Sequence, residues 1–232
     1  MAKKVTGMAA EIFALICSLF MLVPFYMILI NSFKSKEGAA LVNLSLPDEW
    51  HIVENYTEMF KEGGLGLAFR NSVLLTVPSV LVIILVSSLA GFVLQRRVSK
   101  ASKRLLMLIL MGLFIPGQII PTYFICYYMH VRTFLAAGLV LIASNLSMGV
   151  FLYTGYFKSI PRELDESAML DGCNGLQLFF HIIFPLLKPI TVTLFIITFM
   201  GIWNDFGTTI YFLNSSRNFT LTLTIYNFFG VH

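Results

Sequence analysis

The sequence is poor in charged residues. Asp, Glu, Lys and Arg make up 12% of its 232 residues, whereas hydrophobic residues make up 57% and the mean hydropathy is +0.82. Soluble domains average roughly a quarter charged residues. A chain with so little charge could not cover its own surface in water, so we expect an integral membrane protein in a lipid bilayer. The net charge of +4 is too small and too unevenly placed to indicate a nucleic-acid partner.

Patterns that carry catalysis or bind cofactors are also missing. The three cysteines, Cys17, Cys126 and Cys173, are odd in number and scattered, so they form no disulfide framework. The sequence has no Gly-x-x-x-x-Gly-Lys-Ser/Thr phosphate loop, and we therefore do not expect the chain to hydrolyse ATP itself. The four histidines and the acidic residues show no metal-ligand spacing. We expect no enzyme, no cofactor and no metal.

Long uncharged runs dominate what is present. Each can cross a hydrocarbon core of about 30 Å as a helix, the form in which backbone amides are satisfied inside lipid. We predict one transmembrane domain over residues 1–232, an all-α polytopic fold with five spans, at about 10–33, 71–95, 105–129, 134–157 and 189–213. The first run follows Lys3 and Lys4, but its 22 uncharged residues exceed the core of a secretory signal, which indicates a retained span.

The placement of basic residues predicts the orientation. The segment between the second and third spans holds five basic residues and no acid, and the N-terminus and the loop at 158–188 add further lysines and arginines. The segment at 34–70, on the other side, holds four basic and six acidic residues. The positive-inside rule therefore places the N-terminus and the loop at 158–188 in the cytoplasm. In the outer segment, residues 51–60 predict a short amphipathic helix.

The cytoplasmic loop begins with a short acidic stretch, residues 161–172. Pro161 suits a first helical turn, the acidic residues that follow suit the positive end of a helix dipole, and Gly172 suits the left-handed turn that ends a helix. We predict a compact helix that fits a groove on a soluble partner. An apolar face of Leu176, Phe179, Phe180 and Ile183 is predicted to rest on the membrane bundle and to tie this helix to the fifth span.

The order of residues in this loop resembles a family motif. The cytoplasmic loop of binding-protein-dependent ABC importer permeases carries Glu-Ala-Ala, three residues, Gly, nine residues, Ile, any residue and Leu-Pro. In this sequence the matching residues are Glu166, Ala168, Gly172, Ile182 and Pro185, with Ser167 in place of an Ala and Phe184 in place of a Leu. The resemblance implies the type I ABC importer transmembrane fold. It also implies that a separate ATPase is contacted by Glu166, Ser167, Ala168, Asp171 and Gly172.

Segments outside the loop are similar to the carbohydrate branch of that family, the maltose and multiple-sugar importers. They are NSFKS, LPDEWHIVENY, RNSVLLT, and WNDF followed by TLTLTIYNFFG. The resemblance implies an oligosaccharide substrate, a bacterial cytoplasmic membrane, a second homologous permease subunit, two ATP-binding subunits and an extracytoplasmic sugar-binding protein. The branch usually has a sixth span, which we do not find. The alternatives are a permease for another small solute and a non-transporting membrane scaffold.

Polar residues at membrane depth are costly unless they face a bundle interior or a cavity. Gln118 lies in the third predicted span, near Pro116 and Pro121, and either lines a pathway or satisfies a carbonyl freed by the kink. Trp203, Asn204 and Asp205 interrupt the fifth predicted span. They are candidates for sugar contact, with an outer gate or a structural hydrogen bond between subunits as alternatives.

Overall fold

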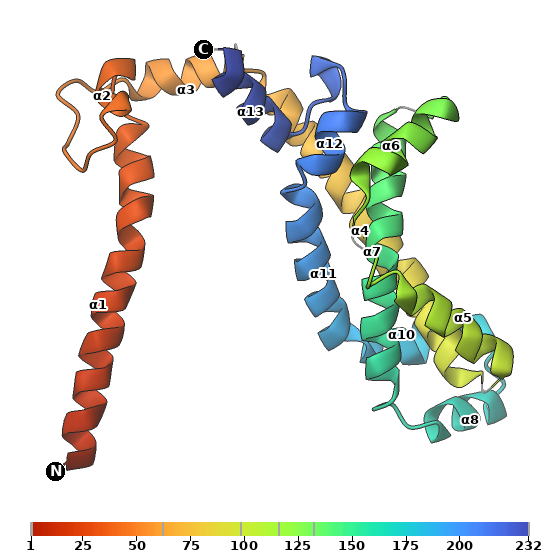
Figure 1. Cartoon of the computed structure of the whole chain (residues 1–232). Helices are drawn as coiled ribbons and strands as arrows, with labels where there is room; N and C mark the ends of the chain where they lie inside the picture. Colours follow the sequence, from red (N-terminus) through yellow and green to blue (C-terminus); the bar gives the residue numbers. More distant parts are fainter. Residues whose placement is uncertain (1, 62, 98, 116, 132, 232) are drawn as a thin grey trace. The chain divides into compact units, whose positions relative to one another are not determined.

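The protein is helical, as a computed structural model shows (Figure 1). The structure describes the backbone of residues 2–61, 63–97, 99–115, 117–131 and 133–231, and side chains between residues 11 and 228 of these ranges. No strand occurs in these ranges. The chain divides into two compact units, Met1–Gly64 and Leu65–His232.

The first unit contains one long helix and two short ones. Helix α1 spans Ala2–Asn31, α2 spans Lys36–Ala40 and α3 spans Ile52–Lys61. The section Glu11–Asn31 is long and apolar enough to cross a membrane, and almost all of its side chains are exposed within the unit. Asn55 of α3 donates to the carbonyls of Ser32 and Lys34, both at 2.9 Å, so α3 is fastened to the end of α1. The amphipathic helix expected at 51–60 is confirmed with a shift of one residue.

The second unit carries the remaining helices. They are α4 (Leu65–Arg96), α5 (Lys100–Met111), α6 (Ile119–Tyr128), α7 (Phe134–Phe157), α8 (Glu163–Leu170), α9 (Gly175–Gln177), a π-helix (Leu178–Ile183), α10 (Phe184–Leu186), α11 (Lys188–Trp203), α12 (Gly207–Phe212), a 3₁₀ turn (Ser216–Asn218) and α13 (Leu221–Val231).

Helices α4 and α7 form the centre of this unit, with α11 packed against both. The buried face of α4 repeats every three or four residues and is made largely of small side chains, such as Ser72, Thr76 and Gly91. A Cβ atom on Gly91 would lie 2.8 Å from the Cβ of Tyr153 in α7, so the two backbones approach as closely as a glycine permits. Small residues provide this close approach in membranes, where apolar side chains gain little by leaving lipid.

Fewer continuous spans are present than the five that the sequence predicts. Among the residues that the structure describes, three helices are long and apolar enough to cross a membrane, and a fourth crossing results if the helices at 175–186 and 188–203, bent by 76°, count as one. The range of the third predicted span holds two shorter helices, α5 and α6, separated at residues 112–118. Gly112 and Gly117 lie in this break, and Pro116 lies outside the described residues. The span bounds therefore remain a prediction.

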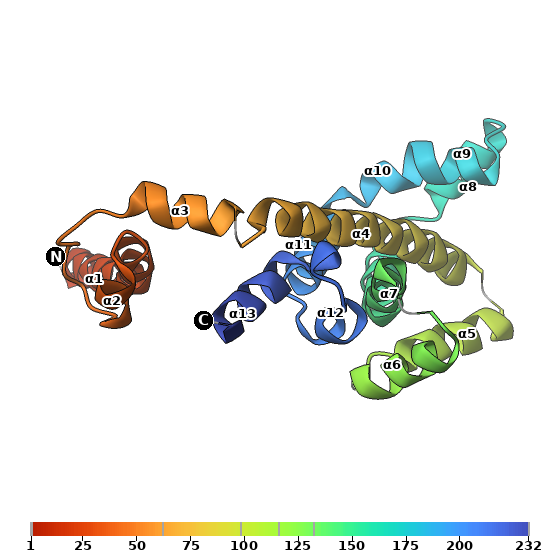
Figure 2. The same ribbon diagram turned by 90° about the horizontal axis from the view of Figure 1, so that it is seen from above.

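The two ends of the second unit differ in the segments they hold (Figures 1 and 2). The end of α4, the start of α5 and helix α8 lie at one end, and α6, α12 and α13 lie toward the other. At the latter end Asn71, near the start of α4, donates to the carbonyls of Arg217 and Phe219 at 2.8 and 3.0 Å. The two loops expected on the cytoplasmic side therefore lie at the same end of the unit.

Candidate coupling site and membrane polar groups

Local residues explain where helix α8 begins and where it ends. Glu163, Asp165 and Glu166 lie in its first turn, where negative charge favours the helix dipole. The helix ends before Gly172, whose φ of +84° is the left-handed conformation that glycine adopts at little cost. The helix expected within 161–172 is confirmed, with its regular part at Glu163–Leu170.

The candidate coupling residues lie on different faces of this helix. Glu166, Ser167, Asp171 and Gly172 are exposed. Ala168, in contrast, is only 3% exposed and packs into the core of its own chain. Its small side chain therefore lets α8 lie close to the rest of the protein, and in this conformation Ala168 is not available to another subunit.

An ion pair joins the start of α8 to the end of α4. The Nε of Arg96 lies 2.6 Å from Oδ2 of Asp165, and Nη2 donates to Oδ1 of the same carboxylate at 3.1 Å. The two side chains are only 13% and 11% exposed. Arg96 also donates to the carbonyls of Ile160 and Pro161, at 3.3 and 3.4 Å, so one guanidinium holds the whole entry into α8.

The segment after α8 is anchored by aromatic rings. Asn174 and Gln177 form a capping box that starts α9, and the chain continues as the π-helix Leu178–Ile183. Phe179 of this π-helix lies 5.5 Å, centroid to centroid, from Phe92 of α4, which in turn lies 5.8 Å from Phe157 of α7. The segment is thereby fixed to the α4–α7 core.

The apolar face predicted for this segment is only partly correct. Phe179 and Ile183 are buried as expected, whereas Leu176 and Phe180 are exposed. The difference arises because a π-helix has more residues per turn than the 3.6 assumed for an α-helix, so other side chains, including Leu178, turn inward.

Apolar side chains also stand out on the exposed side of α8. Leu170 is 89% exposed, and Met169 and Leu176 are exposed as well. Met169 and Leu170 lie between the carboxylates of Glu166 and Asp171 in the sequence, and Leu176 lies just after them in α9. Clustered exposed apolar residues with a polar rim are typical of a protein interaction surface. We call Glu166, Ser167, Met169, Leu170, Asp171 and Leu176 the α8 surface.

At the opposite end of the unit, Asp205 caps a helix. Its Oδ1 accepts the backbone N–H of Thr208 at 2.9 Å and that of Thr209 at 3.3 Å, and its Oδ2 accepts the Thr208 hydroxyl at 3.2 Å. Asn204 donates to the carbonyl of Met200 at 2.9 Å. The Asp205 carboxylate thus caps α12 within its own chain, a role that differs from the hydrogen bond between subunits considered from the sequence.

The ring of Trp203 continues an aromatic row along α11. Phe195 and Phe199 are stacked at 5.5 Å, and Phe199 and Trp203 are stacked at 5.5 Å with planes only 15° apart. The rings repeat every four residues and so share one side of the helix. Trp203 and Asn204 retain exposed surface, which leaves them accessible to a solute.

Gln118 comes directly before α6, at the break in the third predicted span. Its carbonyl accepts the amide and the hydroxyl of Thr122 at 3.1 and 2.7 Å, while its side chain is exposed and does not cap the helix. The neighbouring Ile119 touches the start of α12, where a Cβ on Gly207 would lie 2.7 Å from its Cδ1. The segments that carry Gln118 and Asp205 therefore meet.

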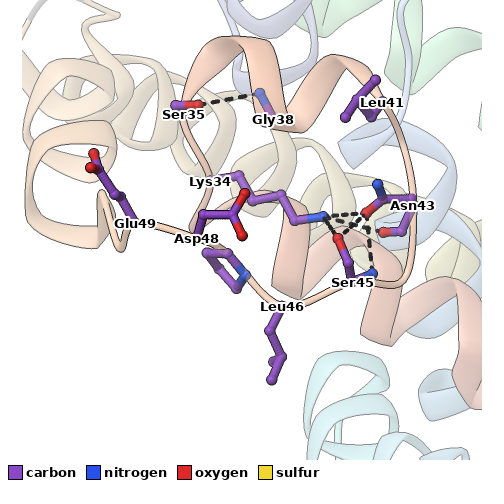
Figure 3. Close-up of a pocket in the computed structure, with 10 residues that line it drawn as sticks. Lys34, Ser35, Gly38, Leu41, Asn43, Ser45, Leu46, Asp48 and Glu49 are labelled. Carbon is purple, nitrogen blue, oxygen red and sulfur yellow. Dashed lines mark hydrogen bonds between the residues drawn. The ribbon is translucent and has the colours of Figure 1, made fainter.

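A polar pocket of about 210 Å³ lies in the first unit (Figure 3). The Nζ of Lys34, a residue only 5% exposed, donates to the Oδ1 atoms of Asn31 at 3.0 Å and of Asn43 at 2.6 Å, and it reaches Ser45 Oγ at 3.5 Å. Figure 3 shows the ammonium group directed at Asn43 and Ser45. These oxygens use the donors of the ammonium group, so the cluster fastens the 41–49 loop to the end of α1.

Sequence reasoning found the acidic helix but not the residues that hold it. Arg96 counted only as one of five positive charges, and Asp165 only as one of three acids. One feature of the sequence could have indicated a special role for Arg96. It directly follows the uncharged run, so of the five basic residues it is the nearest to the predicted span.

The fold of this chain is known from a membrane transporter. A chain of a bacterial ABC transporter involved in the import of the acidic polysaccharide alginate has the same fold, with a TM-score of 0.82 and 19% identity; the match covers 97% of this chain and 80% of that one. The chain belongs to the family of binding-protein-dependent transport system inner membrane components, whose model matches residues 71–230. It is thus a multi-pass membrane permease subunit, and the predicted fold class is confirmed.

Several relatives have names that refer to carbohydrates. The probable starch degradation products transport system permease protein AmyC of Thermoanaerobacterium thermosulfurigenes is 36% identical, over 93% of this chain and 79% of its own length. The melibiose/raffinose/stachyose import permease protein MelC of Bacillus subtilis is 37% identical, over 90% and 76%. The multiple sugar-binding transport system permease protein MsmG of Streptococcus mutans is 33% identical, over 90% and 77%.

Proposed function

We propose that this chain is the permease subunit of an ATP-driven oligosaccharide importer in a bacterial cytoplasmic membrane. The names of its relatives, which refer to starch degradation products, raffinose-type sugars and multiple sugars, support a carbohydrate substrate. Membership of the binding-protein-dependent family supports the proposal that an extracytoplasmic binding protein delivers the sugar. The basic loops support a cytoplasmic N-terminus and a cytoplasmic α8.

The α8 surface is the site where we place the coupling to ATP hydrolysis. In this proposal two ATP-binding subunits supply the hydrolysis, and one of them receives the side chains of Glu166, Ser167 and Leu170. The observation that carries the proposal is the strong exposure of Leu170, on a short helix that its own chain holds firmly from behind. A strongly exposed apolar side chain on a rigid support is well suited to fill a pocket on a partner. Ala168 and Gly172 contribute by shaping the helix rather than by touching the partner.

A second, homologous permease subunit would complete the pathway. Helix α1 exposes an apolar surface that lipid or this second subunit would cover. Movement of the ATP-binding subunits would shift α8 and, with it, the α4–α7 core to which α8 is attached. The cavity between the two permease subunits would then open alternately to the two sides of the membrane.

For the sugar pathway we propose Trp203, Asn204 and Gln118 as contacts. An aromatic ring face together with amide groups suits a sugar, which presents both C–H and O–H groups. Asp205 is assigned to positioning, because its carboxylate oxygens are occupied by the start of α12. The three contact residues lie on segments that approach one another at α6 and α12.

Reconstitution tests the substrate and the coupling separately. The permease pair, the ATP-binding subunits and the binding protein are placed in liposomes, and ATP-dependent uptake of labelled raffinose, maltotriose and an amino acid is compared. We expect uptake of an oligosaccharide only. Uptake of the amino acid alone would favour a permease for another solute, and assembly with the ATPase without any uptake would favour a non-transporting scaffold.

Crosslinking tests the α8 surface directly. With Ser167→Cys in a background that lacks the native cysteines, we expect a crosslink to the ATP-binding subunit that changes in yield when ATP is added. Lys158→Cys, on the exposed loop before α8, is the matched control and should crosslink less. If Ser167→Cys is labelled only by a reagent applied from outside the cell, the proposed orientation is wrong.

A further inference from the structure

We propose that Arg96 and Asp165 are positioning residues that transmit the motion of α8 to α4, so that α4 moves together with α8 when ATP is hydrolysed. This inference rests on the proposed function, and it differs from the sequence-based expectation that the helix is tied to the fifth span. The pair touches neither solute nor nucleotide. It fixes the angle of the helix that does touch the ATP-binding subunit.

The first reason is the geometry of attachment. Arg96 makes two contacts to the Asp165 carboxylate, at 2.6 and 3.1 Å, and two hydrogen bonds to the backbone at Ile160 and Pro161. A planar guanidinium that contacts both carboxylate oxygens and two carbonyls restrains direction as well as distance. In return, Arg162 donates to the carbonyl of Gln95 at 3.5 Å. The last turn of α4 and the start of α8 are thus joined in both directions.

The second reason is that a separate anchor lies one turn away. Phe92 precedes Arg96 by four residues and so shares its face of α4. Its ring contacts Phe179, which follows α8, and Phe157 at the end of α7. The segment that contains α8 is therefore fastened to one face of α4 at two points, one ionic and one aromatic. Two points of attachment transmit rotation, whereas one would act as a hinge.

The third reason is the burial of the pair. Both side chains are largely shielded from water, and a shielded pair resists screening by salt better than an exposed one. Removing one partner leaves the other charge partly buried and unpaired. We therefore expect α8 to lose its fixed angle, rather than its fold, when either charge is neutralised, because the aromatic anchor, the left-handed Gly172 after the helix and the acidic residues Glu163 and Glu166 in its first turn remain.

The experiment compares solute transported per ATP hydrolysed in the full reconstituted complex. Arg96→Gln and Asp165→Asn remove one charge each, and Arg97→Gln, an exposed arginine in the same loop, is the matched control. We expect each of the first two variants to keep hydrolysing ATP while the transport ratio falls about 5-fold or more, in the range of typical coupling factors. The control should keep the wild-type ratio.

Two results would overturn the inference while leaving the proposed function intact. One is a normal transport ratio in Asp165→Asn. The other is a parallel loss of transport and hydrolysis that merely follows the amount of assembled complex, because this would indicate a structural role only. If the wild-type complex shows no ATP-driven uptake, the proposed function itself fails, before any variant is compared.

A distance measurement gives a second readout that does not depend on transport. Spin labels at Leu170→Cys on α8 and Val93→Cys on α4 are measured in lipid nanodiscs without the ATP-binding subunits, after replacement of the native cysteines. We expect one narrow distance distribution, broadened several-fold by Asp165→Asn and unchanged by Arg97→Gln. An equally narrow distribution in Asp165→Asn would show that the ion pair does not set the angle of α8.

Discussion

The contact between α4 and α7 at Gly149 leaves no room for a single added methyl group. A Cβ at Gly149 would lie 2.7 Å from the Cβ of Ser87 and even closer to its Oγ. Carbon atoms touch comfortably at about 3.5–4.0 Å, so Gly149→Ala forces the helices apart by about 1 Å. Overpacking of this kind costs about 1–3 kcal/mol.

The matched control lies on the same helix. Gly155, also in α7, has no atom within 4 Å of its added Cβ. Gly155→Ala therefore gains only the helix propensity of alanine, up to about 1 kcal/mol, a gain that Gly149→Ala shares. The difference in stability between the two variants isolates the steric cost, and we expect Gly149→Ala to be less stable than Gly155→Ala by about 1–3 kcal/mol.

The assay is thermal unfolding of the purified complex in nanodiscs. At about 2–4 °C per kcal/mol for a chain of this size, Gly149→Ala should melt several degrees below Gly155→Ala. Adding Ser87→Gly to Gly149→Ala should restore the melting temperature, because it removes both clashing atoms and Ser87 Oγ has no hydrogen-bond partner in the described part of the chain. Equal melting temperatures for the two alanine variants would refute the reasoning.

Three further predictions concern the loops. Gly172→Ala places a side chain at φ +84° and should destabilise the end of α8 by about 1–2 kcal/mol. Gly175→Ala, where nothing lies near the added Cβ, should not destabilise it. Hydrogen exchange in α8 should therefore be faster in Gly172→Ala than in Gly175→Ala. Lys34→Met removes the ammonium donor from two part-buried amide oxygens, of which that of Asn43 keeps its hydrogen bonds from Ser45. The loss should cost about 1–3 kcal/mol and speed proteolysis of the 41–49 loop, and an unchanged cleavage rate would contradict this. The hydrogen bond to Glu54, with a smaller contribution from Glu49, raises the pKa of His51 above its ordinary value of 6.5. The contribution of His51 to α3 is therefore complete below about pH 6.5 and is lost as the pH rises through the raised pKa. Hydrogen exchange of α3 should show this pH dependence, and Glu54→Gln should weaken it.

The sequence was sufficient for features that depend on local composition. The uncharged runs at 71–95 and 134–157 correspond closely to α4 and α7, because the absence of charge over such a length leaves a membrane helix as the main option. Gly172 was expected to adopt a left-handed conformation and does. The family motif, read together with its spacing, led to the correct family.

Features that depend on distant contacts could not be derived. Five basic residues follow the second predicted span, and only the place of Arg96 directly after the uncharged run sets it apart; nothing local indicates that its partner is Asp165, 69 residues away. The burial of Ala168 is likewise a tertiary property. Helix periodicity predicts which residues share a face, but it does not predict which other element packs against that face. The break at 112–118 was anticipated only as a kink, since glycine and proline indicate a weak point without fixing how far the helix separates.

The π-helix at Leu178–Ile183 holds one residue more than an α-helix would over the same rotation. A residue of an α-helix turns the chain by about 100°, and a residue of a π-helix, with its i→i+5 hydrogen bonds, turns it by less. Deleting one residue within this stretch would therefore let it relax into ordinary α-helix while α8 keeps nearly its present orientation relative to α11. Loss of a second residue could not be absorbed in this way and would rotate α8 by about 100°, so exchange of this segment between importers should tolerate a difference of one residue and fail at a difference of two.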